Sequence, residues 1–295
     1  MFRAALRLAR PAALMLASLS LVACVGSAGA AGPSPEPPES PTPMNPDTPI
    51  FRVSWEGGFV SPEMLLGRVP LVTVYADGRV ITQGAQPAIY PGQLMPNLLE
   101  RTLSADALER LIDLAREKNL LRTVHYDFSG IADAPDTVLD IQLDGKTYRF
   151  SAYALAEAGV DVAAPGLDEA DIKGRADLRA FVNALTGIAP ADFVDDEHAY
   201  SAERVRIYAG KAVIVPNSEP PGEQAAIDWP LADLATAGTP IDNAVLDMRC
   251  QVVAGDELAQ VLPLLTGANS LQTWASGGDL YSFVVVPLLP GEAGC

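Results

Sequence analysis

Residues 71–82 read Leu-Val-Thr-Val-Tyr-Ala-Asp-Gly-Arg-Val-Ile-Thr. β-Branched and aromatic residues flank Asp77-Gly78, and Asp-Gly between such runs is a strong signal for an antiparallel hairpin. Just upstream, residues 51–55 alternate apolar and polar side chains, which predicts another strand with one buried face. This stretch therefore predicts an antiparallel sheet.

A second hairpin and two helices are predicted downstream. Residues 137–143 and 146–153 flank Asp144-Gly145 in the same strand-turn-strand pattern. Ser104 is placed to cap a helix with one apolar stripe, and a further helix is expected over residues 176–185. The stripe of the first helix consists of Leu108, Leu111, Ile112 and Ala115. Hairpins alternating with helices indicate an α+β fold, in which antiparallel sheets carry helices packed on one face.

The composition changes after residue 191, where the acidic run 195–197 marks a predicted domain boundary. Strands are expected over residues 204–208, 212–215, 244–253 and 280–286. Asp256 is placed to cap a short helix that Pro263 should kink or stop. We therefore predict an α+β domain over residues 50–190 and a second, smaller α+β domain over residues 191–295.

Several short motifs of the first half resemble those of an uncharacterised family of secreted bacterial α+β domains. The shared features are a glycine pair after a strand, two strand-Asp-Gly turns, a leucine-rich helix and an Asp-Ala-Pro stretch. They correspond here to Gly57-Gly58, residues 75–78, residues 103–121, Asp133-Ala134-Pro135 and residues 143–146. In that family the first strand is usually followed by a cysteine-containing turn, which this chain lacks. The resemblance implies a fold and no activity.

The N-terminal segment has the layout of a secretory signal. Arginines at positions 3, 7 and 10 precede an apolar run that ends at Ala23 and is short for a membrane span. Leu21-Val22-Ala23-Cys24 resembles the lipobox of bacterial lipoproteins. The resemblance implies that residues 1–23 are a signal peptide and that Cys24 receives a diacylglyceryl group. Two acyl chains give stable membrane anchoring. Cleavage as an ordinary secretory signal near residues 28–30 is the alternative.

Residues 24–49 contain many prolines among small, polar and acidic residues. Such a composition buries no core and favours extended polyproline II structure. We therefore expect a lipid-anchored tether that holds the folded part away from the cell membrane, on its extracytoplasmic face.

The charge balance excludes some partners. The chain has 20 basic and 37 acidic residues, a net charge of −17. Nucleic-acid binding depends on clustered lysine and arginine, so we expect no nucleic-acid partner. The expected partners are the membrane, through the N-terminal lipid, and another envelope protein or polymer.

Three cysteines are present, and lipidation of Cys24 leaves Cys250 and Cys295. Two cysteines in an oxidising compartment are most simply a structural disulfide. Metal ligation needs more cysteine or histidine nearby than the sequence offers, so we predict no metal site and no cofactor.

The sequence contains none of the HExxH, GxSxG, Ser-x-x-Lys or GxxxxGK motifs. The candidates that remain for catalysis are His125 with Asp127, Asp133 and Asp136. Paired carboxylates serve glycosidases even when they are far apart in sequence. The favoured hypothesis is a non-enzymatic binding or interaction module of the cell envelope. The alternative is a hydrolase that acts on an envelope polymer with paired carboxylates.

Overall fold

The computed structural model describes residues 45–128, 130–157, 167–213, 225–243 and 245–295. The predicted signal peptide, Cys24 and the tether up to residue 44 lie outside these ranges. So do the end of the strand expected over residues 212–215 and the start of the one expected over residues 244–253. Residues 44–295 form one compact unit, so the division into two domains stays a prediction.

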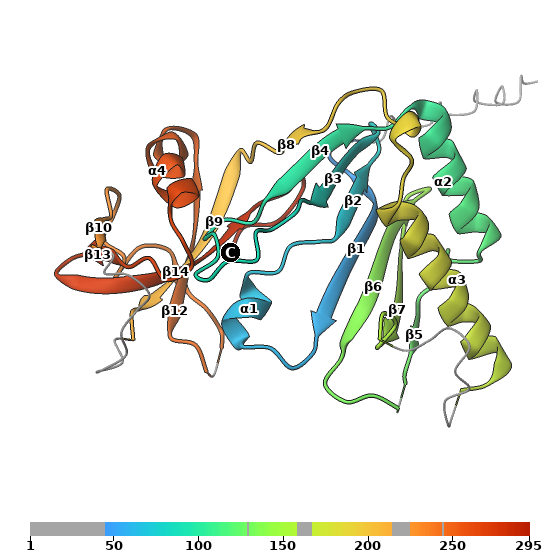
Figure 1. Cartoon of the computed structure of the whole chain (residues 1–295), viewed down its shortest axis with the longest axis horizontal. Helices are drawn as coiled ribbons and strands as arrows, with labels where there is room; N and C mark the ends of the chain where they lie inside the picture. Colours follow the sequence, from blue (N-terminus) through green and yellow to red (C-terminus); the bar gives the residue numbers. More distant parts are fainter. Residues whose placement is uncertain (1–44, 129, 158–166, 214–224, 244) are drawn as a thin grey trace, which may run out of the picture. The chain divides into compact units, whose positions relative to one another are not determined.

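The fold is α+β, with two sheets in which antiparallel pairs dominate (Figure 1). The first sheet has eight strands in the order β5-β7-β6-β1-β2-β3-β4-β8. Their bounds are β1 Pro49–Gly57, β2 Val72–Tyr75, β3 Arg79–Gln83, β4 Leu98–Thr102, β5 Val124–Tyr126, β6 Pro135–Leu143, β7 Lys146–Tyr153 and β8 His198–Ala199. Only β5 and β7 pair in parallel among them.

Both predicted hairpins form. β2 pairs with β3 across Asp77-Gly78, and β6 pairs with β7 across Asp144-Gly145. In the second turn Asp144 and Gly145 have φ values of 53° and 69°, a left-handed conformation that asparagine, aspartate and glycine adopt most readily. The two hairpins lie side by side in the sheet through β1, which pairs with both β2 and β6.

Helices α2 (Ala105–Glu117) and α3 (Glu169–Thr186) cover one face of the first sheet (Figure 1). The Ser104 hydroxyl accepts a hydrogen bond from the Ala107 amide, as the predicted cap requires. α3 begins at residue 169, earlier than predicted, because Asp168 caps it through the Asp171 amide. Leucines and phenylalanines of both helices and of β1, β6 and β7 share a single core.

The second sheet has six strands in the order β10-β13-β14-β9-β12-β11, with helix α4 (Gly255–Gly267) packed against it. The strand bounds are β9 Arg204–Lys211, β10 Ile227–Asp228, β11 Thr239–Pro240, β12 Met248–Ala254, β13 Trp274–Ser276 and β14 Asp279–Pro287. The predicted Asp256 cap is wrong, because α4 begins one residue earlier, at Gly255, and its N-cap residue Ala254 has no side chain that could accept a hydrogen bond. α4 continues past Pro263, contrary to one of the two outcomes predicted for that residue. Leu258, Val261 and Leu265 are buried on both sides of the proline, so packing outweighs the lost backbone hydrogen bond.

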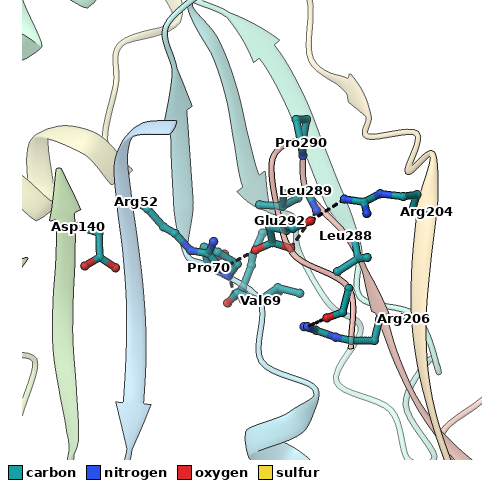
Figure 2. Close-up of polar contacts among 12 residues, drawn as sticks. Arg52, Val69, Pro70, Asp140, Arg204, Arg206, Leu288, Leu289, Pro290 and Glu292 are labelled. Carbon is teal, nitrogen blue, oxygen red and sulfur yellow. Dashed lines mark hydrogen bonds and ion pairs between the residues drawn. The ribbon is translucent and has the colours of Figure 1, made fainter. Parts of the chain in front are cut away.

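The C-terminal segment, residues 288–295, connects the two sheets (Figure 2). Leu289 is 2 % exposed and packs with Tyr75, Ile81 and Leu98 on the face of the first sheet opposite α2 and α3. The Glu292 carboxylate lies 2.5 Å from the Arg52 guanidinium of β1, and the Glu292 carbonyl accepts a hydrogen bond from Arg204 of β9. The segment therefore binds both sheets before the chain ends.

A disulfide joins Cys295 at the end of this segment to Cys250 in β12, with an S–S distance of 2.11 Å. The bond closes a loop across 45 residues of sequence. It fixes the C-terminal segment to the second sheet, while Leu289 and Glu292 hold the same segment to the first.

Candidate binding groove

A groove of about 850 Å³ lies between the end of β1, helix α1 (Pro62–Leu66) and the second sheet. Trp55, Phe59 and Met64 line it from the first sheet and α1, and Ser282 and Val284 line it from β14. We call it the α1 groove. Gly67 at the end of α1 allows α1 to approach β14 closely, because a Cβ there would lie 3.1 Å from a methyl carbon of Val284.

The turn after β1 places Phe59 at the rim of the α1 groove. Gly57 and Gly58 have φ values of 65° and 82°, which residues other than glycine rarely adopt. The Phe59 amide then donates a hydrogen bond to the Asp133 carbonyl. The phenylalanine ring is left 85 % exposed, although phenylalanine is normally among the more buried residue types.

Helix α1 adds a second exposed apolar side chain. Its N-terminus is built by Ser61, whose hydroxyl accepts a hydrogen bond from the Met64 amide, and by Pro62 in the first turn. Met64 is 61 % exposed, and α1 buries none of its residues. This helix was not predicted from the sequence, although Ser-Pro-Glu at its start is a helix-start signal.

The loop of residues 84–97 closes another side of the α1 groove with Gln86 and Gln93. Its backbone is fixed near both ends. The Gly84 amide donates to the Asn97 carbonyl, while the Leu94 amide donates to the Ala268 carbonyl beyond α4. The first hydrogen bond closes the loop, and the second ties it to the segment that follows α4.

The charged groups at the α1 groove are unevenly paired. Arg68 donates a hydrogen bond to the Trp55 carbonyl. Glu63 and Asp133 are exposed, and their carboxylates make no hydrogen bond or ion pair within the described part of the chain. The rim therefore presents two carboxylates that are open to a ligand.

A separate polar cluster, which we call the His125 cluster, lies at the β5 edge of the first sheet and contains three of the four catalytic candidates. His125 of β5 has Nδ1 2.8 Å from the Ser151 hydroxyl and Nε2 3.0 Å from the Asp127 carboxylate. The Asp136 carboxylate lies 3.5 Å from the same Nδ1. Asp133 instead lines the α1 groove. Ser151 was missed by the sequence analysis because only the pairing of β5 with β7 brings it opposite His125.

Exposure limits what the His125 cluster can do. Ser151 is 8 % exposed, whereas the Asp127 side chain is 94 % exposed. A serine activated by histidine needs an accessible hydroxyl and a histidine oriented by a fixed third group. Here the hydroxyl is covered and the carboxylate stands in water.

Behind His125, the neighbouring Tyr126 side chain is fixed in the first core. Arg122 donates a hydrogen bond of 2.7 Å to the Tyr126 hydroxyl, and Gly174 of α3 leaves room for that hydroxyl. The Arg175 guanidinium donates to the Tyr126 carbonyl, and burial lowers the pKa of Arg175, with Arg179 adding repulsion. These contacts position β5 at the edge of the sheet.

The acidic run 195–197 is fixed to the first sheet. The Asp195 carboxylate accepts a hydrogen bond from the Thr102 amide of β4, which lowers the pKa of Asp195. Across the described ranges, no group of three or more His, Cys, Asp and Glu side chains is arranged to hold a metal ion. Within the same ranges, no helix is both long and apolar enough to cross a membrane.

Two of the three tryptophans belong to the second core, the cluster of buried residues formed by the second sheet and α4. Trp274 stacks on Phe283 with ring centroids 4.8 Å apart, and Trp229 meets both rings edge-on. Only Trp55 is exposed among the tryptophans.

Comparison with protein-family models, with curated proteins and with solved structures found no match to this chain.

Proposed function

We propose that this chain is a cell-envelope lipoprotein, anchored through Cys24, whose folded part binds another envelope component in the α1 groove. The observation that carries the proposal is the exposure of Phe59 and Met64 beside a groove of about 850 Å³. Ligand sites are concave, mostly apolar and supplied with a few polar groups. The α1 groove combines these features, with glutamines and serines among its apolar lining residues.

The ordered backbone around Phe59 indicates that its ring is exposed in order to bind a partner and is not exposed incidentally. A left-handed turn at Gly57-Gly58 and a backbone hydrogen bond to Asp133 fix the segment, so the ring is held outward by ordered backbone. Exposed apolar side chains scattered singly need no explanation, but those gathered at a concave surface mark interaction sites. Burial of such a ring by a partner would contribute about 1.5–3 kcal/mol.

The lining of the α1 groove offers hydroxyl and carboxylate groups for recognition. Ser270 and Ser282 line the α1 groove, and the described lining residues include no histidine that would activate either hydroxyl. Serine needs an adjacent base to act as a nucleophile. Glu63 and Asp133 supply negative charge for recognition.

Site-specific photocrosslinking in intact cells tests the groove. A benzophenone amino acid replaces Phe59 in the full chain, and a matched variant carries it at Val194, which is 66 % exposed and outside the α1 groove. A discrete adduct formed at position 59 and missing at position 194 is the expected result. Equal adducts at both positions, or none at either, would overturn the proposal.

Membrane fractionation of Cys24→Ala tests the anchor. We expect the wild-type chain in the membrane fraction with a mass increase from the diacylglyceryl group, because two acyl chains anchor stably. The variant should lack that mass increase. A wild-type chain without any lipid would contradict the lipoprotein assignment.

The second candidate function is a hydrolase of an envelope polymer, and the His125 cluster is the observation that favours it. Asp127 and Asp136 both lie within 3.5 Å of the His125 ring. Release of soluble fragments from labelled peptidoglycan by the wild type, and its loss in Asp136→Asn, would establish the hydrolase. Release by neither chain would rule out the hydrolase, and equal release by both would rule out the His125 cluster as its site.

A further inference from the structure

We infer that the α1 groove takes a polypeptide segment in which apolar side chains alternate with lysine or arginine. This inference rests on the proposed function and names the chemistry of the partner. It is carried by two features of the groove, an adaptable apolar lining and two carboxylates that have no partner among the described residues.

The apolar lining suits side chains of varied shape. Met64 of α1 and Met248 of β12 both line the α1 groove, and Val69, Leu94 and Val284 add aliphatic surface. Methionine is unbranched and polarizable, so it adapts to different apolar partners and is frequent at surfaces that bind peptides. A volume of about 850 Å³ is in the range of known ligand pockets and accommodates several side chains.

The charges at the rim select for a cationic partner. Glu63 and Asp133 are exposed and unpaired within the described residues, whereas nearby Glu56 lies 2.5 Å from the Arg149 guanidinium. The only basic residue among the described lining residues, Arg68, donates a hydrogen bond to a backbone carbonyl. Lysine or arginine in the partner would supply the missing opposite charge.

The net charge of the chain also favours a cationic partner. At −17 it repels anionic polymers and anionic lipid surfaces and steers cationic partners towards the protein. Neutral glycans and acyl chains carry no group that would pair with Glu63 or Asp133. A polypeptide is the envelope component that offers apolar and cationic side chains together.

Three labelled synthetic peptides test the inference. They share one pattern of leucines and differ only in the residues between them, which are lysine, glutamine or glutamate. Binding to residues 44–295, which form a compact unit with both cores and the disulfide, is followed by fluorescence anisotropy. We expect the lysine peptide to bind most tightly and the glutamate peptide least.

Variants assign that binding to the groove. Phe59→Ser should weaken the lysine peptide roughly tenfold or more, since it removes a large apolar contact. Glu63→Gln combined with Asp133→Asn should weaken the lysine peptide roughly threefold to tenfold and leave the glutamine peptide unchanged. Val194→Ser, which alters an exposed apolar residue elsewhere, should change neither peptide.

The failures of the two proposals are distinguishable. Equal affinity for all three peptides, lost in Phe59→Ser, would overturn the cationic preference and keep the groove as a binding site. A photocrosslinked adduct at position 59 without any peptide binding would also overturn this inference alone. Binding of zwitterionic vesicles in place of peptides, or self-association abolished by Phe59→Ser, would assign the groove to a membrane or a second copy. Neither adduct nor peptide binding would overturn both.

Discussion

Removal of the disulfide between Cys250 and Cys295 should destabilise the folded unit more than any single surface change. The bond closes a loop across 45 residues of sequence. In the chain-entropy description, a loop of this length restricts the unfolded chain by about 4 kcal/mol. Reduction restores that freedom to the unfolded chain.

The folded state should survive this change. Leu288 and Leu289 are buried, the Tyr200 hydroxyl donates to the Leu288 carbonyl, and Glu292 pairs with Arg52. These contacts hold the C-terminal segment without the covalent bond. The effect therefore falls mainly on the unfolded state, and a chain of this size should lose about 10 °C of melting temperature.

Urea unfolding measures the effect with two matched samples, the oxidised wild type and the same chain under reductant. Cys250→Ala with Cys295→Ala provides a third sample that needs no reductant. We expect the free energy of unfolding to fall by about 4 kcal/mol and the dependence on urea to steepen, because the reduced unfolded chain is more expanded. A fall below about 1 kcal/mol in both comparisons would refute the reasoning.

Three further predictions follow from single side chains. Leu289→Ala should lower the free energy of unfolding by about 2–5 kcal/mol, because it leaves a cavity at a buried site. Leu271→Ala, at a residue that is 42 % exposed, should have little effect. Urea unfolding of both variants tests the prediction. Gly174→Ala should destabilise by about 1–3 kcal/mol because its Cβ would lie 2.1 Å from the Tyr126 hydroxyl, and an unchanged melting temperature would contradict that packing. Burial raises the pKa of Tyr200 to about 12, so its contribution to stability is full below pH 10 and is lost as pH rises towards 12. Absorbance titration of the phenolate, with Tyr200→Phe as the reference, should show one tyrosine ionising near pH 12.

Local signals determined much of the first sheet. Asp-Gly between runs of β-branched residues specifies a hairpin through backbone conformation alone, so both hairpins could be predicted. Helix α2 could also be predicted, because the Ser104 cap and the apolar stripe of the helix lie within a few turns of each other. For α4 a short helix was predicted but its full length was not, because its continuation past Pro263 depends on Leu265 fitting a core made by distant strands.

Most of the candidate site could not be predicted from the sequence. Phe59 and Met64 look like ordinary core residues when burial is unknown, and only the completed fold leaves them exposed beside β14. Ser151 and His125 are separated along the chain and meet because β5 pairs in parallel with β7.

By itself, the sequence determined the two Asp-Gly turns, the Ser104 cap of α2, the α+β class and the presence of two cysteines for a disulfide, since each depends on neighbouring residues or on composition. Only the tertiary structure decided how the C-terminal segment connects the two sheets and where apolar side chains remain exposed. Both depend on contacts between residues far apart in sequence, such as Arg52 with Glu292, and no local pattern encodes them.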